Sequence, residues 1–391
     1  MHKQFFTRCR LFSVLVVFLL VSAGVQAQQV IIPAPPQLAA SAYLLIDVDT
    51  GKVLVEHNAD QQLPPASLTK MMTAYLVFSE ISRGNIKEDD LVDISVKAWR
   101  MGGSKMFIRE GTRVSVIDLL RGVIIQSGND ASVALAEFVA GSEGAFVDVM
   151  NQQAALLGMT QTTFHNATGW PAEGHVTTAR DLSLLARALI TDHPKNYKLY
   201  SEKYFQYNGI NQPNRNKLLF RDKSVDGIKT GHTDEAGFCL VASAQKDGMR
   251  LVSVVMGTRS ESSRAAESQK LLTYGFRFFQ THELYKANEV MSESRVWAGR
   301  SDQVKLGLSE QALLTIPRGS EKSIKASMLI DEIIKAPIKI GDELGQLEVR
   351  LHGELLLERP LVALNAVEEA GLLARLWDSI KLFFIGLFDV K

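Results

Sequence analysis

Apolar residues recur along the chain at two spacings, and the change of spacing predicts where strands give way to helices. Residues 42–47 and 52–56 flank Asp49-Thr50-Gly51 in a pattern typical of a β-hairpin. After Pro64-Pro65, residues 67–81 carry apolar side chains at helical spacing. Four more helices are predicted, over residues 115–126, 131–140, 142–157 and 178–190. The first of these begins with a capping box.

The pattern returns to strands in the second half of the chain. Three strands are predicted within 226–258, with a turn at Lys246-Asp247-Gly248, and a helix over 261–282. Strands from both ends of this region must meet in one sheet, with helices on its faces. We therefore expect a mixed α/β (α+β) domain over 41–284, with an antiparallel sheet flanked by helices. Residues 285–366, rich in Val, Ile, Leu and short turns, predict a small β-rich second domain.

The first residues have the pattern of a secretory signal peptide. A basic start precedes an apolar run over 11–21, which is shorter than the about 20 residues that a membrane span needs. Small or β-branched residues end the segment at Ala27, so we expect 1–27 to be removed and 28–40, rich in Gln and Pro, to form a linker. An uncleaved anchor is the alternative.

Residues 371–391 form a predicted amphipathic helix. Leucine and aromatic residues lie on one face, and Arg375, Asp378 and Lys381 lie on the other. A transmembrane helix is disfavoured because Asp378 and Lys381 would each cost about 2.5–3.5 kcal/mol near its centre. We expect the helix to lie in the plane of a membrane surface. The alternatives are a helix docked on the protein's own core and a helix that pairs two chains.

Composition removes several classes of function. Of 391 residues, 43 are Lys or Arg and 43 are Asp or Glu, so no basic field indicates a nucleic-acid partner. The eight histidines are scattered, and neither H-E-x-x-H nor paired C-x-x-C occurs, so we expect no metal and no cofactor. Without residues 1–27, Cys239 is the single cysteine, which excludes an intramolecular disulfide.

Ser67-Leu68-Thr69-Lys70 is the first motif that carries chemistry. Ser67 and Lys70 share a helix face, so the lysine can take the proton of the serine hydroxyl. Lys70 can act as a base only when neutral, and both burial and a nearby cation, expected to be Lys229, favour that form. The spacing alone is weak, because Ser243 to Lys246 repeats it on a predicted strand.

Two further motifs follow in order, Ser127-Gly128-Asn129 between two predicted helices and Lys229-Thr230-Gly231 on a predicted strand. At average residue usage, a tripeptide such as Lys-Thr-Gly is expected only about 0.05 times in a chain of this length. Taken one by one, Ser127 or Asn129 could be a helix cap and Lys229 a solvated strand residue. Their order and context favour one site.

Together the three motifs resemble those of D-alanyl-D-alanine carboxypeptidases, the low-molecular-mass penicillin-binding proteins. The resemblance extends over about residues 40–390. It implies a serine β-lactamase/DD-peptidase-like fold and, as substrate, the peptidoglycan stem pentapeptide, from which the terminal D-alanine is removed. It also implies covalent inhibition by β-lactam antibiotics and a location at the periplasmic face of the bacterial inner membrane.

The resemblance assigns catalytic roles to the first two motifs. Ser67 would attack the penultimate D-Ala carbonyl and become acylated, while Lys70 takes its proton. Ser127 would relay a proton toward the leaving D-Ala, and Asn129 would hydrogen-bond the substrate amide. The backbone N–H groups of Ser67 and His232 would form the oxyanion hole.

It also assigns substrate-binding roles to the strand motif. Lys229 and Thr230 would bind the terminal carboxylate. Gly231, which lacks a Cβ, would let the substrate backbone approach the strand. Arg264 is expected to bind the same carboxylate. Arg259 is the competing candidate, and the other alternative is that Arg264 is a plain surface arginine.

Two other functions compete with this interpretation. A class A β-lactamase carries a glutamate that activates the deacylating water. Glu173 is nearest in position, but its surroundings do not match that loop. A non-catalytic penicillin-binding scaffold is the other alternative, and the intact polar motif positions disfavour it.

Overall fold

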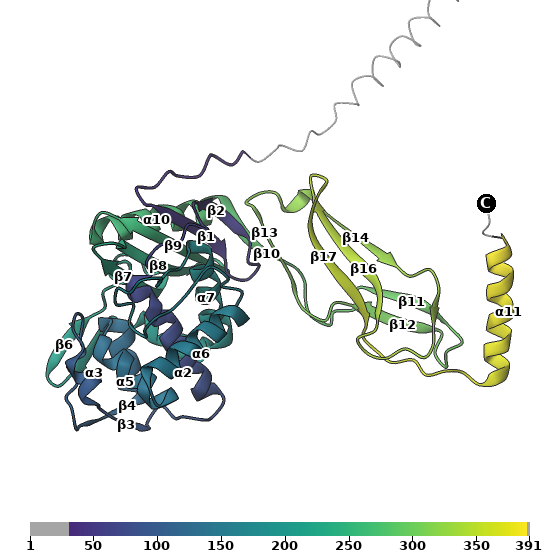
Figure 1. Cartoon of the computed structure of the whole chain (residues 1–391). Helices are drawn as coiled ribbons and strands as arrows, with labels where there is room; N and C mark the ends of the chain where they lie inside the picture. Colours follow the sequence, from purple (N-terminus) through teal and green to yellow (C-terminus); the bar gives the residue numbers. More distant parts are fainter. Residues whose placement is uncertain (1–30, 389–391) are drawn as a thin grey trace, which may run out of the picture.

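The structure, a computed structural model, describes residues 31–388. The predicted signal peptide over 1–27 lies outside the described residues, as do the first residues of the predicted linker and the last three of the predicted terminal helix. Figure 1 shows two bodies joined end to end, with helix α11 (Leu372–Phe388) at the end farthest from the first body.

One antiparallel sheet organises the first body. Its strand order is β2-β1-β9-β8-β7, so the amino-terminal hairpin lies beside strands from residues 225–258. Leu44 faces Val254, and Val254 faces Val241. This confirms that strands from both ends of the region meet in one sheet. The strands are β1 (Ala42–Asp47), β2 (Val53–His57), β7 (Val225–Thr233), β8 (Gly237–Lys246) and β9 (Met249–Thr258).

Alternate residues of these strands enter two separate cores, because successive side chains point to opposite faces of a sheet. Leu44 and Val254 join the large core, and Leu45 and Val255 join the smaller one. Helix α10 (Glu261–Phe278) covers the smaller core (Figure 1). The main helices over the other face are α2 (Lys70–Ser82), α4 (Val116–Arg121), α5 (Asn129–Ala140), α6 (Glu143–Leu156) and α7 (Ala179–Asp192).

Shorter elements connect these helices and strands. The helical turns are η1 (Ala66–Thr69), α3 (Val96–Arg100), the π-helix η2 (Gly122–Gln126), α8 (Pro194–Tyr197), η3 (Lys198–Ser201) and α9 (Leu218–Arg221). Two small hairpin-like sheets pair β3 (Leu91–Asp93) with β4 (Arg113–Ser115) and β5 (Tyr204–Tyr207) with β6 (Ile210–Pro213).

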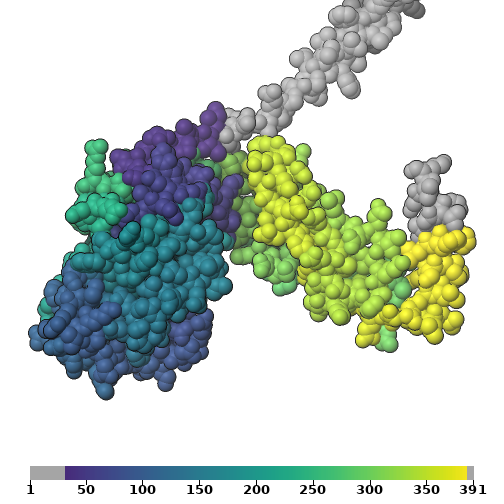
Figure 2. Space-filling model, in the orientation of Figure 1, coloured from purple at the N-terminus to yellow at the C-terminus, as the bar shows by residue number. Residues whose placement is uncertain are grey.

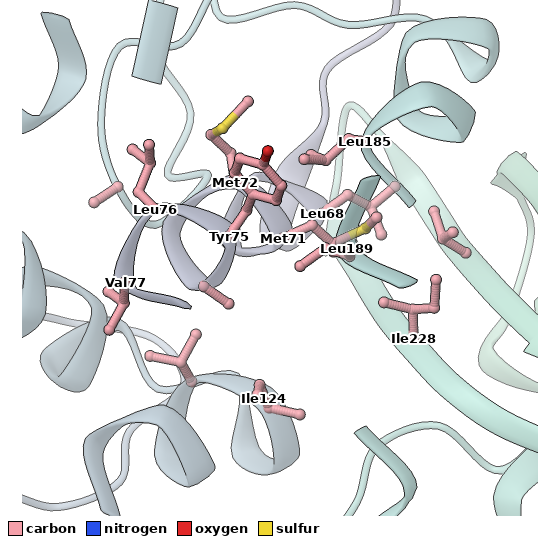
Figure 3. Packing of buried hydrophobic residues seen from close by; sticks show 14 of the residues in the cluster. Leu68, Met71, Met72, Tyr75, Leu76, Val77, Ile124, Leu185, Leu189 and Ile228 are labelled. Atoms are coloured by element: carbon pink, nitrogen blue, oxygen red, sulfur yellow. The ribbon is translucent and has the colours of Figure 1, made fainter. Parts of the chain in front are cut away.

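Helix α2 lies at the centre of the large core. Its residues from Lys70 to Ser79 are all buried. Figure 3 shows its apolar side chains between Ile124 of η2, Leu185 and Leu189 of α7, and Ile228 of β7. A helix that is apolar on every side belongs inside a protein. The same position takes Lys70, the first residue of α2, out of water.

The predicted helix over 261–282 is wrong in its last residues. Helix α10 ends at Phe278, and β10 (Phe279–Tyr285) pairs antiparallel with β13 (Ala312–Pro317). Phe279 is buried in the smaller core with an extended backbone. The local apolar pattern could not reveal this, because the partner strand lies far along the chain.

The second body is built on a six-stranded sheet with the order β14-β16-β17-β12-β11-β15. The β10–β13 ribbon connects it to the first body, and Figure 2 shows open space beside this neck. Its other strands are β11 (Ser292–Trp297), β12 (Gln303–Gly307), β14 (Ile324–Ile330), β15 (Ile334–Lys335), β16 (Glu343–Leu351) and β17 (Glu354–Ala363), with the turn η4 (Glu321–Ser323). The predicted fold class is confirmed.

A buried carboxylate joins the two bodies. Asp47, at the end of β1, is fully buried and accepts hydrogen bonds from the hydroxyls of Thr281 (2.6 Å) and Thr315 (2.7 Å). Lys52 also donates to the Thr315 carbonyl at 3.2 Å. Hydrogen bonds to a charged acceptor out of water are among the stronger ones in proteins.

Candidate active site

Ser67 lies on a turn with an unusual backbone. The residue before it, Ala66, has φ +47°, a conformation that costs free energy for any residue with a side chain. Gly169 presses against this turn so closely that a Cβ at Gly169 would lie 1.7 Å from the Ala66 carbonyl oxygen. The turn is therefore held from outside by the loop around Gly169, and Ser67 stays partly exposed at its tip.

Lys70 lies directly behind the serine. Its Nζ donates to Ser67 Oγ (3.0 Å), to Asn129 Oδ1 (2.7 Å) and to the Thr168 carbonyl. The side chain is completely buried. The amine is thus within proton-transfer distance of the hydroxyl, as the motif spacing predicts.

The surroundings of Lys70 favour its neutral form. Burial, and then the positive charge of Arg215, lower the pKa of Lys70 to about 7, although Asp130 acts in the opposite direction. The sequence predicts that Lys229 supplies the repelling charge, and here the structure differs. Lys229 itself has a pKa well below its usual value, because of burial and then of Lys70. Arg215, at the edge of the site, is the cation that acts on Lys70.

Ser127 and Lys229 form a second hydroxyl–amine pair. Ser127 ends the π-helix η2 in the left-handed conformation, with φ +63°. Its Oγ accepts from Lys229 Nζ at 2.9 Å. Lys229 is buried and also donates to the Thr230 carbonyl at 3.0 Å. The second pair therefore has the same chemistry as the first.

Asn129, the first residue of α5, connects the first pair to the wall of the site. Its Oδ1 accepts from Lys70, and its Nδ2 donates to the Gly102 carbonyl at 2.8 Å. The next residue, Asp130, is fully buried and accepts from the backbone N–H groups of Met106 (2.8 Å) and Phe107 (2.9 Å). The start of α5 thereby holds the loop that borders the site.

Gly231 brings β7 close to the serine turn. A Cβ at this position would lie 3.1 Å from the Pro65 carbonyl oxygen and 3.2 Å from Leu68 Cγ. The sequence predicts that the missing Cβ makes room for the substrate. In the structure it makes room for the turn that carries Ser67, because the Cβ direction is filled by protein.

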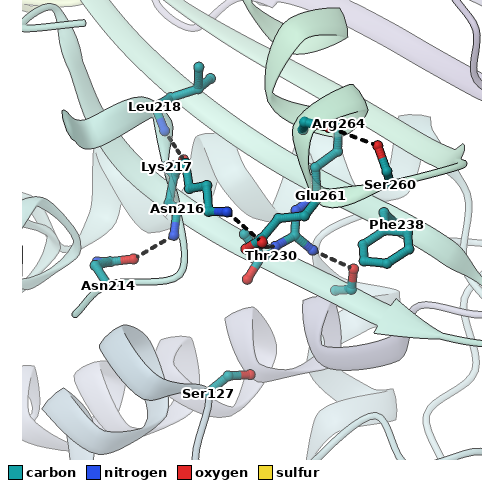
Figure 4. A network of polar contacts seen from close by, with 12 residues as sticks. Ser127, Asn214, Asn216, Lys217, Leu218, Thr230, Phe238, Ser260, Glu261 and Arg264 are labelled. Atoms are coloured by element: carbon teal, nitrogen blue, oxygen red, sulfur yellow. Dashed lines mark hydrogen bonds and ion pairs between the residues drawn. The ribbon is translucent and has the colours of Figure 1, made fainter. Parts of the chain in front are cut away.

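A charged network forms the opposite wall, as Figure 4 shows. Arg264 of α10 donates to the Gly231 carbonyl (3.1 Å) and to Glu261 (3.2 Å), and Glu261 also pairs with Lys217 at 2.7 Å. The Arg264 guanidinium lies 5.6 Å from the centre of the Phe238 ring.

These groups surround one pocket of about 260 Å³. Lys70 and Lys229 lie behind its wall and donate to the wall residues Ser67 and Ser127, and Asn129 lies behind the wall as a partner of Lys70. Arg264 lies in the wall, whereas Arg259 is exposed and does not. The wall residues are Ser67, Ser104, Ser127, Arg215, Thr230, Gly231, His232, Phe238, Glu261 and Arg264.

Comparison with known proteins decides the family. Residues 29–260 match the family model of the D-alanyl-D-alanine carboxypeptidases, peptidase family S11. Residues 279–369 match the C-terminal domain of penicillin-binding protein 5. The chain belongs to the D-alanyl-D-alanine carboxypeptidase family.

Individual members of this family are similar over nearly the whole chain. The carboxypeptidase DacA of Escherichia coli K12 is 46% identical over 361 residues, covering 90% of each protein. DacC of the same strain is 45% identical and covers 94% of this chain and 93% of DacC. The crystal structure of penicillin-binding protein 5 from Haemophilus influenzae has a TM-score of 0.82 and 42% identity, covering 86% of this chain and 100% of that one.

Three site residues of this carboxypeptidase chain escape sequence reasoning. Arg215 stands in no motif, yet its positive charge, after burial, lowers the pKa of Lys70. Thr168 contributes only its carbonyl, which any residue could supply. Asp130 directly follows Asn129, and an acidic residue in the first turn of a helix has an ordinary explanation as a cap. Only the adjacency of Asp130 to a motif could have suggested it.

Within residues 31–388, no three His, Cys, Asp or Glu side chains come together as a possible metal site. No helix in the described part of the chain is long and apolar enough to cross a membrane.

Proposed function

We propose that this chain is a serine-type D-Ala-D-Ala carboxypeptidase that removes the terminal D-alanine from peptidoglycan pentapeptides through an acyl-Ser67 intermediate. One observation carries the assignment of roles. Two hydroxyl–amine pairs, Ser67 with Lys70 and Ser127 with Lys229, open into the same pocket. Acyl transfer needs an activated nucleophile and a proton donor for the leaving group, and the two pairs can supply one each.

The reaction begins when neutral Lys70 takes the proton of Ser67. The Ser67 oxygen attacks the carbonyl of the penultimate D-Ala, and the backbone N–H groups of Ser67 and His232 stabilise the oxyanion. The C–N bond breaks as Ser127 passes a proton to the leaving amine, and the proton that Lys70 took from Ser67 then replaces the one that Ser127 gave away. Water then hydrolyses the ester, and Ser67 regains its proton.

The terminal carboxylate of the substrate orients it in the pocket. Thr230, Lys229 and Arg264 bind this carboxylate, with Arg264 held in place by Glu261. Asn129 binds the substrate amide. In the described geometry both ends of the Asn129 side chain already have protein partners, so substrate binding exchanges the bond to Gly102 or to Lys70.

Penicillins acylate Ser67 in the same way. A related solved structure, penicillin-binding protein D2 of Listeria monocytogenes, is in the ampicillin-bound form and is 34% identical over 62% of this chain.

A β-lactamase would also need rapid deacylation. Glu173, the candidate for that step, is exposed and lines a neighbouring pocket, and the described hydrogen bonds of Lys70 include no glutamate.

We also propose that the protein is exported and held at the periplasmic surface of the inner membrane. The signal-like segment over 1–27 supports export. The apolar side of α11 supports membrane attachment, because Leu373 is 85% exposed, Trp377 61% and Phe383 67%. A peptidoglycan-trimming enzyme would there face its substrate.

The decisive experiment measures D-alanine release from a pentapeptide beside hydrolysis of a chromogenic β-lactam. We expect fast peptide cleavage with slow drug turnover. Ser67→Ala is expected to lose both D-Ala release and covalent labelling by penicillin. Labelling that survives in Ser67→Ala would disprove the nucleophile assignment, and rapid β-lactam hydrolysis would favour the β-lactamase.

A further inference from the structure

A groove of about 570 Å³ lies along the exposed side of helix α10. Ala266, Thr273 and Arg277 line it from α10, and all three are exposed. The nearly buried side chains of Leu218 and Tyr274 line it as well and give it an apolar interior. The groove shares no lining residue with the catalytic pocket, so it is a separate feature of the first body.

The segment from Pro33 to Pro36 forms the other wall of this α10 groove. The Tyr274 hydroxyl donates to the Pro33 carbonyl at 2.9 Å. On either side of the segment, Ile32 and Leu38 pack against the smaller core. The wall is therefore held at both ends, and the groove exists before any ligand binds. A site that is formed in advance loses less conformational freedom on binding.

The length of the groove suits a short stretch of polypeptide. Its lining on α10 extends from Ala266 to Arg277, which is about 16 Å at 1.5 Å per residue. An extended chain of five residues has about the same length at 3.3 Å per residue. Because side chains of an extended chain alternate in direction, one set can enter the apolar interior while the other set stays at the rim.

The charged side chains that line the groove are all basic: Arg221 of α9, and Lys270 and Arg277 of α10. Lys270 pairs with Glu267 at 2.9 Å. Arg221 and Arg277 are exposed and form no ion pair with any residue between 31 and 388. An apolar groove with two free cations at its rim is complementary to an apolar segment that carries carboxylates.

We propose that the α10 groove is a docking site for an acidic peptide segment of another protein. The segment is extended, about five residues long, and alternates apolar side chains with Glu or Asp. Its apolar side chains lie against Leu218 and Tyr274, and its carboxylates face Arg221 and Arg277. The contact is an interaction surface apart from the catalytic pocket and needs no D-Ala-D-Ala in the ligand.

The test uses the fluorescein-labelled peptide amide Glu-Phe-Glu-Leu-Glu and measures its anisotropy with the purified full chain in detergent. Two matched peptides carry Gln at the three Glu positions or Gly at the two apolar positions. We expect saturable binding that is about three- to tenfold tighter for the Glu peptide than for the Gln peptide, since exposed ion pairs are individually weak. The difference is expected to vanish at high salt, because exposed charges are screened. The Gly peptide is expected not to bind.

Variants assign the binding to the groove. Arg221→Gln combined with Arg277→Gln is expected to bring the affinities of the Glu and Gln peptides to about the same value. Ala266→Phe fills the groove and is expected to abolish saturable binding. Lys223→Gln is the matched control, because Lys223 is exposed and close to Arg221 in the sequence but does not line the groove, and it is expected to bind as the wild type. Labelling by a fluorescent penicillin shows whether each variant is folded.

A second control excludes the catalytic pocket, which also contains arginines. Prior acylation with benzylpenicillin is expected to leave the affinity for the Glu peptide unchanged. A loss of binding on acylation would place the peptide in the catalytic pocket and overturn the docking site.

Three further results would also overturn the proposal. The first is the absence of saturable binding of the Glu peptide up to about 1 mM. The second is equal binding of the Gly peptide, which would indicate attraction by charge alone. The third is self-association of the chain in sedimentation that Ala266→Phe abolishes, because a second copy would then be the occupant of the groove.

Discussion

At the scale of single residues, we expect the protonation of Lys70, the proposed base, to determine how activity depends on pH. The pKa of Lys70 is about 7, and the proposed base must be neutral. We therefore expect kcat/KM for D-Ala release, which reports the free enzyme, to rise as the pH increases through about 7. Arg215→Gln removes a positive charge that opposes protonation. The pKa of Lys70 then rises, and the ascending limb moves to higher pH.

Arg259→Gln provides the control for this shift. Arg259 is exposed and does not line the pocket, so its loss is expected to leave the ascending limb in place. If Arg215 only bound substrate, Arg215→Gln would raise KM without moving the limb. If the ascending limb of the pH profile moved equally in both variants, Arg215 would have no specific effect on the pKa of Lys70.

Sequence patterns reveal the residues whose chemical type the proposed reaction requires. They miss residues that contribute only because the fold brings them near the site. Ser67 and Lys70 stand at a fixed spacing because both belong to one helical turn. Thr168 accepts a hydrogen bond from the Lys70 amine, and Arg215 acts on the same amine through its charge, each from a loop distant in the sequence. Their contribution depends on tertiary contacts, which leave no periodic trace in the sequence.

At the scale of elements, the contact between the Gly169 loop and η1 positions Ser67, the proposed nucleophile. Gly169→Ala would place a Cβ 1.7 Å from the Ala66 carbonyl oxygen, so the loop or the turn must move. We expect penicillin acylation of Ser67 to slow at least tenfold, because small displacements in an active site reduce rates by such factors. The acylation rate measured with a fluorescent penicillin checks this.

Gly111→Ala isolates the effect of the clash. Gly111 has φ +70°, close to the +81° of Gly169, but nothing lies within 4 Å of the added Cβ. Both variants share the strain of a left-handed alanine, of about 1–2 kcal/mol. Equal acylation rates in the two variants would show that strain alone, and not the contact with η1, is responsible.

Most elements of the first body follow from periodicity, and their ends depend on the fold. The three predicted strands within 226–258 are β7, β8 and β9, and the turn predicted at Lys246-Asp247-Gly248 lies where β8 ends and β9 begins. The helix predicted to end at 282 ends at Phe278, because Phe279 packs into a core and pairs with β13. Local pattern cannot identify a strand whose only partner belongs to the other body.

At the scale of the whole molecule, Asp47 holds the two bodies together. Asp47→Ala removes an acceptor of hydrogen bonds from Thr281 and Thr315, and we expect it to destabilise the junction by roughly 3 kcal/mol. Small-angle scattering should then show a broader distribution of overall dimensions, while penicillin labelling persists. Thr315→Val, which keeps the shape of the side chain, should have a smaller effect in the same direction. Asp89→Ala, at an exposed site, should have none.

Helix α11 links the structure of the molecule to its proposed place on the membrane. Asp378 accepts from the backbone N–H of Ala298 at 3.0 Å, so the polar side of α11 faces the second body. The apolar side, with Leu376 and Phe383, is thereby turned outward. This arrangement suits a membrane surface better than a helix docked on the protein's own core.

Deletion of residues 371–391 is therefore expected to release the protein from lipid vesicles. The rate of D-Ala release from soluble peptides is expected to stay within about twofold of that of the full chain.

Phe383→Glu should weaken vesicle binding more than tenfold, because it removes about 1.5–3 kcal/mol of apolar burial and adds a charge that resists burial. Ala374→Glu adds the same charge on the polar side and should bind nearly as the wild type. Equal loss in both variants would indicate electrostatic repulsion, and a truncated protein that still sediments with vesicles would place the attachment elsewhere in the chain.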